Sequence, residues 1–267
     1  MKIYDKLLNK INELRKINKN IITNAFFTTD DLRTMIEKEN VSIKILEDII
    51  IILIEEECLI RLYFYANSLE SFNHIQNIIP KYLDKPIIAD IIGKDIGLEQ
   101  ITNKLKELNF YNYGKFIRMN RLLEKCDESN ISNVEVATLE QVDEIKDILY
   151  KELDVYSSHL PSKDELYRAV ENKEITIIME QKKIIGLVYF KELGKKLIYW
   201  HILFVHEEFR GKGISDNLIK NKFGKLQSDM TCQLWVDTDN KYAINKHSNY
   251  GFKADGLVDY IMMYRGE

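Results

Sequence analysis

A glycine-containing segment in the last third of the sequence carries its clearest chemical signal. An apolar run ends at Val205, a short charged turn follows, and a predicted helix begins near residue 211. The first turn of a helix presents backbone N–H groups without intrahelical partners at the positive end of the helix dipole. Glycines let such a backbone approach a ligand closely. The segment therefore predicts a cradle for a diphosphate, built by Arg210, Gly211, Lys212, Gly213, Ile214 and Ser215.

The spacing of these glycines excludes two common phosphate-binding motifs. A P-loop requires GxxxxGK followed by Ser or Thr, and the dinucleotide-binding fingerprint requires GxGxxG. Residues 204–215 match neither pattern. Taken alone, the segment also fits a surface turn with two glycines and solvated charges, so the neighbouring sequence has to distinguish the two interpretations.

Two patterns together resemble the GNAT superfamily of N-acetyltransferases. Arg210, Gly213 and Ser215 fill the family signature Gln/Arg-x-x-Gly-x-Gly/Ala, with serine in place of the final small residue. The second pattern begins at Asn240-x-x-Ala243 and ends where a Gly-Phe pair closes the following predicted helix. The order of predicted strands and helices from residue 134 onward also resembles the family.

The resemblance implies a direct, ternary-complex transfer of an acetyl group from acetyl-CoA to an amine, without a metal. In the family, the loop here at residues 210–215 holds the pyrophosphate, and Asn240 is assigned to the same cofactor. The end of the preceding strand pairs with the pantetheine arm and supplies an N–H to the thioester oxygen. Such a fixed donor strengthens as the carbonyl oxygen gains charge. In this sequence that strand end comprises Leu203, Phe204 and Val205.

The amine must lose a proton before it can attack. An alkylamine with a pKa near 10.4 is mostly charged at pH 7, so reaching the neutral form costs roughly 4–5 kcal/mol. His201 is the best candidate base. It lies four residues before Val205, where the resemblance to arylalkylamine N-acetyltransferases, another GNAT branch, implies a histidine, and its intrinsic pKa suits the task. The alternative is a histidine that only packs in the strand. Tyr199 shares its strand face, as a pocket wall or part of a proton path, whereas Trp200 should face the opposite side.

The departing thiolate poses the opposite problem, the supply of a proton. The family usually places a tyrosine seven residues after the asparagine of the second motif, but this sequence has His247 there. Either His247 is the acid, or Tyr250 reaches the sulfur from the same predicted helix. A third possibility is that no side-chain acid is needed, because a thiolate is a tolerable leaving group.

The elements that must position these residues suggest two α/β units. We expect an N-terminal degenerate GNAT-like domain at 1–124 and a catalytic domain at 133–267, each a twisted mixed β-sheet flanked by helices. The polar, turn-rich stretch at 124–133 separates them. Both halves end in strand, helix, strand, helix and a final apolar strand, which suggests two copies of one unit, although any two α/β domains can share that order. The first half lacks the glycine loop, so we expect no CoA there.

Composition narrows the function further. A net charge of −4 and the lack of a dense basic run argue against nucleic acid. Three dispersed cysteines form neither a disulfide framework nor a metal site, and we expect Cys58 and Cys232 in the core. We find no signal peptide or membrane span and expect a cytoplasmic protein. Small-molecule or peptide amines are the expected acceptors, and the oligomeric state stays open.

Two alternatives to this function remain open at the level of sequence. The chain could be a non-catalytic acyl-CoA sensor, which the missing tyrosine at position 247 supports. It could also be an acyltransferase with a different acyl donor or a hydroxyl acceptor.

Overall fold

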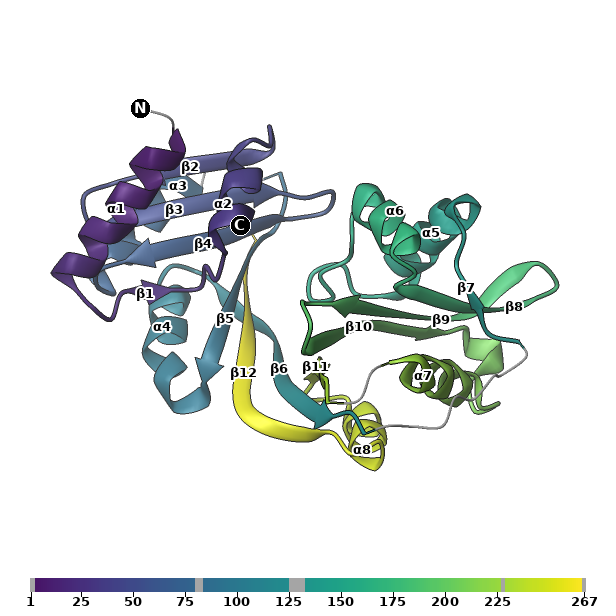
Figure 1. Ribbon diagram of the computed structural model, residues 1–267. Coiled ribbons are helices and arrows are strands. Elements are labelled where there is room, and N and C mark those ends of the chain that lie inside the picture. Colours follow the sequence, from purple (N-terminus) through teal and green to yellow (C-terminus); the bar gives the residue numbers. More distant parts are fainter. Residues whose placement is uncertain (1–2, 80–83, 125–132, 227–228, 266–267) are drawn as a thin grey trace. The chain divides into compact units, whose positions relative to one another are not determined.

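The computed structural model describes residues 3–79, 84–124, 133–226 and 229–265 (Figure 1). The chain forms two compact units: Met1–Phe116 together with Gly256–Glu267, and Ile117–Asp255. The stretch predicted to separate two domains lies outside the described residues, apart from its ends. Cys126 also lies outside the described residues.

The first unit is a mixed sheet with helices packed against it. Its strands run in the order β2-β3-β4-β5-β12-β6, with the short β1 beside β4. Neighbours are antiparallel from β2 to β4, and β4 pairs in parallel with β5. Its elements are α1 (Ile3–Ile17), β1 (Ile22–Thr23), α2 (Thr29–Ile36), β2 (Val41–Ile45), β3 (Ile49–Glu55), β4 (Ile60–Ala66), α3 (Asn73–Ile78), β5 (Ile87–Lys94), α4 (Asp95–Glu107) and β6 (Tyr111–Leu122).

Helix α1 shows how sequence periodicity builds this unit. Leu7, Ile11 and Leu14 recur at helical spacing and are buried. They join Ile50 and Ile52 of β3 in one hydrophobic cluster. The amphipathic pattern of the first 17 residues therefore places α1 on one face of the sheet.

The second unit is also a mixed sheet, with helices packed on both faces. Its strand order is β6-β11-β10-β9-β8-β7. One core lies between the sheet and α5 and α6, and another lies between the sheet and α7. Its elements are β7 (Glu135–Val136), α5 (Val142–Glu152), α6 (Lys163–Glu171), β8 (Ile175–Glu180), β9 (Lys183–Glu192), β10 (Leu197–Val205), α7 (Ile214–Lys225), β11 (Thr231–Asp237) and α8 (Lys241–Asn249). The last strand, β12 (Lys253–Tyr264), begins in this unit and belongs to the first unit from Gly256 onward.

Each unit takes part of its sheet from the other half of the sequence. Leu257–Tyr264 of β12 pairs antiparallel with β5 in the first unit. Conversely, β6 continues into the second unit beside β11, where Leu123 N–H donates to the carbonyl of Met230 at 2.8 Å. The ranges 1–124 and 133–267 expected from sequence do not anticipate this exchange, because the last strand of each half serves both units.

The fold class expected from sequence is confirmed: both units are mixed sheets flanked by helices. Cys232 lies in the core of the second unit as predicted, but Cys58 is only half-buried in the turn between β3 and β4. The apolar residues around Cys58 belong to the two strands, whereas the turn itself is partly solvated. Among the described helices, none is long and apolar enough to cross a membrane.

Candidate active site

Two parallel strands of the second unit separate after their first residues. β10 and β11 pair only at Leu197–Tyr199 with Thr231–Gln233, although β10 continues to Val205 and β11 to Asp237. From Trp200 to Val205, the edge of β10 that faces β11 forms no ladder with it. Its backbone N–H and C=O groups are therefore available to an extended ligand.

An irregularity in β10 decides which side chains face which core. Its pairing with β9 shifts between Trp200 and Ile202, so the usual alternation of a strand is interrupted. Trp200 lies in the core on the α7 side, whereas Ile202 and Phe204 lie in the core on the α5 and α6 side. Leu203 packs toward α7. After the shift, the side chains of β10 therefore face the opposite sides of the sheet from those that regular alternation would give.

A cavity of about 620 Å³ lies next to the separated strand end. Side chains of β10, α7, α8 and the end of α5 line it. Most of the residues predicted for cofactor binding and two of those predicted for catalysis are among its lining: Leu203, Phe204, Val205, Arg210, Gly211, Gly213, Ile214, Ser215, Asn240, His247 and Tyr250. Lys212, Tyr199 and His201 are not part of that lining.

Two glycines and several backbone N–H groups without acceptors lie at the start of α7. Gly211 and Gly213 both have φ of 78°, and a Cβ added to either would meet no atom. Within the described part of the chain, the N–H groups of Gly211, Gly213, Ile214 and Ser215 have no hydrogen-bond acceptor, whereas that of Lys212 donates to the carbonyl of Phe209 at 3.4 Å. The unpaired amides sit at the positive end of the helix dipole and are suited to an anion.

The two basic residues of the loop have different surroundings. Arg210 Nε donates to the carbonyl of Val205 at 3.2 Å, so this side chain fixes the end of β10 against the loop. Lys212 Nζ lies 4.8 Å from the centre of the Phe209 ring and is exposed. Arg210 therefore shapes the cradle, and Lys212 contributes charge from outside the cavity.

Asn240 explains the spacing of the second motif. Its side-chain oxygen accepts from Ala243 N–H at 3.0 Å and caps α8. An asparagine three residues before that amide is a favoured N-cap. Because the oxygen is engaged in the cap, the amide nitrogen is the polar atom that Asn240 can offer to a ligand.

His247 lies in the cavity wall against Trp200. The two ring centres are 4.9 Å apart at 89°. Burial lowers the pKa of His247 to about 4, and the charge of Lys246 acts in the same direction. Nδ1 is buried and has no hydrogen-bond partner among the described residues. The imidazole is therefore neutral at pH 7 and donates from one nitrogen only.

Tyr250 is held by the first turn of α7. Its hydroxyl donates to Asp216 Oδ1. Burial raises the pKa of Tyr250 above its usual value, and the hydrogen bond and charge of Asp216 add to the increase. Tyr250 therefore keeps its proton at neutral pH and carries it next to the cradle.

His201 and Tyr199 lie on the other side of β10. Their rings stack with centres 5.3 Å apart, and Tyr189 of the α5 and α6 core lies 5.2 Å from His201. His201 Nε2 is 3.0 Å from the carbonyl of His159, so this nitrogen carries the proton and Nδ1 is the basic one. Burial lowers the pKa of His201 to about 4, with the charge of His159 as the next cause. The residues predicted for catalysis are thus divided between two faces of one strand.

Sequence reasoning missed three charged side chains of the cavity: Asp216, Lys246 and Glu152. Lys246 was detectable, because it falls at helical spacing with Asn240, Ala243 and Tyr250 on one face of α8. Glu152 was not, because it ends a helix far from the motifs in sequence. Only the packing of α5 against the end of β10 brings it there.

Comparisons with known proteins agree with this geometry. A family model described as an acetyltransferase (GNAT) domain matches residues 119–260. A tandem GNAT protein from the clavulanic acid biosynthesis pathway is similar in structure, with a TM-score of 0.62, 10% identity, and coverage of 98% of this chain and 96% of that one. No curated protein matches the sequence significantly.

Two bacterial structures described as GCN5-related N-acetyltransferases are also similar. The one from Sphaerobacter thermophilus has a TM-score of 0.58 at 8% identity, covering 89% of this chain and 85% of that one. The one from Kribbella flavida has a TM-score of 0.56 at 10% identity, covering 88% and 93%. At these identities the similarity concerns the fold.

Proposed function

Since the chain belongs to the GNAT acetyltransferase family, we propose that it transfers an acetyl group from acetyl-CoA to the amine of a small molecule or peptide. One observation carries the proposal. The strands β10 and β11 separate beside a cavity of about 620 Å³ that has unpaired helix amides in its wall. An extended arm that ends in a diphosphate fits this arrangement, because the strand edge pairs with the arm and the amides bind the anion.

The residues at 210–215 bind the diphosphate in this proposal, and Asn240 faces the pantetheine. The arm follows the unpaired edge of β10 at Leu203, Phe204 and Val205. A backbone N–H of this strand end donates to the thioester oxygen. The donor is fixed by the strand, so it stabilises the negative charge of the tetrahedral intermediate without reorganising.

The reaction is a direct attack of the amine nitrogen on the thioester carbon. A C–N bond forms, the C–S bond breaks, and the electron pair leaves with the CoA sulfur as a thiolate. The nitrogen loses one proton and the sulfur gains one. His201 Nδ1 accepts the first proton from its side of β10, and His247 or Tyr250 supplies the second from the cavity side, or water does.

The amine acceptor is supported by the charge at the end of α5. Glu152 and Leu153 line the cavity next to Phe204. The last turn of a helix is its negative end, and the Glu152 carboxylate adds a negative charge there. A protonated amine is attracted to such a place, whereas a neutral hydroxyl gains less.

A sensor that binds acyl-CoA without turnover is the second candidate. It is favoured by the side chains on the cavity side: His247 is neutral at pH 7, and the Tyr250 hydroxyl is bound to Asp216. Neither group is poised to protonate a thiolate in this arrangement. Turnover therefore requires that Tyr250 changes its partner, that His247 donates its single N–H proton, or that water protonates the thiolate.

Binding and turnover measured together test the proposal. We expect acetyl-CoA to bind in calorimetry and CoA thiol to be released with at least one member of a panel of alkylamines, aminoglycosides and peptides. Mass spectrometry should find 1 mol of acetylated amine for each mol of thiol. Binding without release on any acceptor indicates the sensor, and loss of both rejects the cofactor site. Malonyl-CoA and succinyl-CoA in the same assay test the donor.

A further inference from the structure

A lysine outside the family motifs lies over the start of α7. Lys246 Nζ is 2.5 Å from Ser215 Oγ and 3.3 Å from Asp216 Oδ1. Both partners belong to the first turn of α7, and all three side chains line the cavity. Lys246 is partly buried, with 23% of its side chain exposed. A cation is thus held beside the amides assigned to the diphosphate.

Asp216 provides a carboxylate at the start of α7, in the lining of the cavity. Its carboxylate lies in the first turn of α7, where the helix dipole favours negative charge. It also accepts from the Tyr250 hydroxyl. These hydrogen bonds and the charge of Lys246 lower the pKa of Asp216, so it is ionised at neutral pH. The helix dipole, the Lys246 ammonium group and the Tyr250 hydroxyl therefore all stabilise the ionised Asp216 carboxylate.

We propose that Lys246 binds the diphosphate of acyl-CoA and that Asp216 is an internal anion that competes with the diphosphate for it. This inference rests on the proposed function and assigns a cofactor-binding residue and an affinity-setting residue to the same site. When the diphosphate approaches, Lys246 exchanges the carboxylate for phosphate oxygens. Repulsion between the two anions moves the carboxylate away and releases the Tyr250 hydroxyl. Cofactor binding thereby makes a proton donor available on the cavity side of β10.

Calorimetry with CoA tests the two roles through effects of opposite sign. Lys246→Met should weaken CoA binding roughly 10- to 100-fold, the value of a hydrogen bond to a charged group. Asp216→Asn keeps the shape and an acceptor for Tyr250 but loses the charge. It should tighten CoA binding about 5-fold, because the competing ion pair is removed. A tighter complex cannot result from misfolding.

Lys220→Met is the matched control for charge. Lys220 lies on the exposed face of α7 and does not line the cavity. Its loss should change the affinity by less than about 2-fold, since screened surface charges contribute little. S-acetyl-pantetheine, which has no diphosphate, should bind Lys246→Met and the unaltered protein equally. Equal losses in the two lysine variants, or weaker binding by Asp216→Asn, would overturn the inference.

Failure of the inference differs from failure of the proposed function. If the unaltered protein binds CoA and Lys246→Met binds it equally well, only the role of Lys246 is rejected. If the unaltered protein does not bind CoA, both are rejected. For the release of Tyr250, its fluorescence or ring NMR signals should change on adding CoA to the unaltered protein. In Tyr250→Phe the cofactor should still bind.

Discussion

The two units contain the same pair of separated parallel strands, with different contents. In the first unit β4 and β5 pair only at Ile60–Arg61 with Ile87–Ile88, as β10 and β11 do over three residues in the second. β4 leads through a turn without glycine into the six-residue α3, whereas β10 leads through the glycine loop into the twelve-residue α7. The backbone plan is shared, and the loop that follows the first strand of each pair differs.

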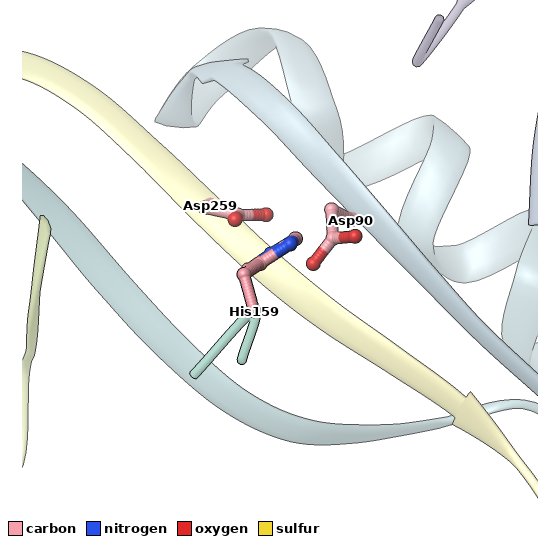
Figure 2. Close-up of side chains that lie close together, drawn as sticks. All are labelled: Asp90, His159 and Asp259. Atoms are coloured by element: carbon pink, nitrogen blue, oxygen red, sulfur yellow. The ribbon is translucent and has the colours of Figure 1, made fainter. Parts of the chain in front are cut away.

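Buried charged side chains lie where β4 and β5 begin to separate. Arg61 Nη1 is 3.0 Å from Asp90 Oδ2, joining β4 to β5. Asp259 of β12 lies beside Asp90 of β5 (Figure 2), and its Oδ1 has no hydrogen-bond partner among the described residues. An ion pair therefore bridges the strands of the first unit, whereas Trp200 and His247 border a cavity in the second. The comparison shows buried charges between the parallel strands of the first unit and a cavity beside the strand end of the second.

Removing the buried arginine should cause the largest effect. Arg61→Ala leaves Asp90 as an uncompensated buried charge and should lower the free energy of unfolding by about 3–5 kcal/mol. The double variant Arg61→Met with Asp90→Asn should recover most of that loss. Urea titration at pH 7 measures both. A loss below about 1 kcal/mol in Arg61→Ala would contradict a bridging role for the ion pair.

A carboxylate placed in the glycine loop of the second unit should weaken binding rather than stability. Gly213→Asp should weaken CoA binding more than about 100-fold, because a like charge facing the diphosphate costs several kcal/mol. Gly194→Asp is the control: Gly194 also has a positive φ, 76°, and open space at Cβ, but lies in the β9–β10 turn. Both variants carry similar backbone strain. Equal CoA affinity of the two in calorimetry would reject the cradle.

Loss of the proposed base should depend on pH. His201→Ala should lower kcat/KM by about 100-fold at pH 6 and by less at pH 9, where more of the amine is already neutral. Because the pKa of His201 is about 4, the unaltered enzyme should show no histidine inflection between pH 5 and 8. The pH–rate profiles of both proteins check this. A constant ratio from pH 6 to 9 would remove His201 as the base.

The smallest expected effect is a pH-dependent change of stability in the first unit. Burial raises the pKa of Asp259 well above its usual value, and the charge of Asp90 adds to the increase. The folded protein then holds a proton that the unfolded chain releases above about pH 4, so stability falls as pH rises. Asp259→Asn should stabilise by on the order of 1 kcal/mol at pH 8 and not at all below pH 4. Thermal unfolding of both proteins between pH 4 and 8 measures this gain in stability. A gain that does not change with pH would contradict the raised pKa of Asp259.

The sequence alone determined the local parts of this protein. The glycine loop, the Asn240 cap and the amphipathic α1 were predictable because short-range backbone geometry and helical periodicity govern them. The two-unit α/β plan was predictable because both halves repeat one order of elements. The strand end at Leu203–Val205 and the loop at residues 210–215 were predicted to lie close together because only a short turn separates them in the sequence.

Tertiary structure decided the rest. The exchange of β6 and β12 depends on strand pairing between residues more than 100 positions apart, which no local propensity encodes. The shift in β10 places Ile202 and Phe204 on the α5 and α6 side and Leu203 on the α7 side. It arises from the register of β10 against β9, since a one-residue shift reverses the face of every following side chain. Lys246, Asp216 and Tyr250 meet only because α8 packs beside the start of α7. We expect the charges that packing brings together to set the affinity of a site whose backbone is predictable from the sequence.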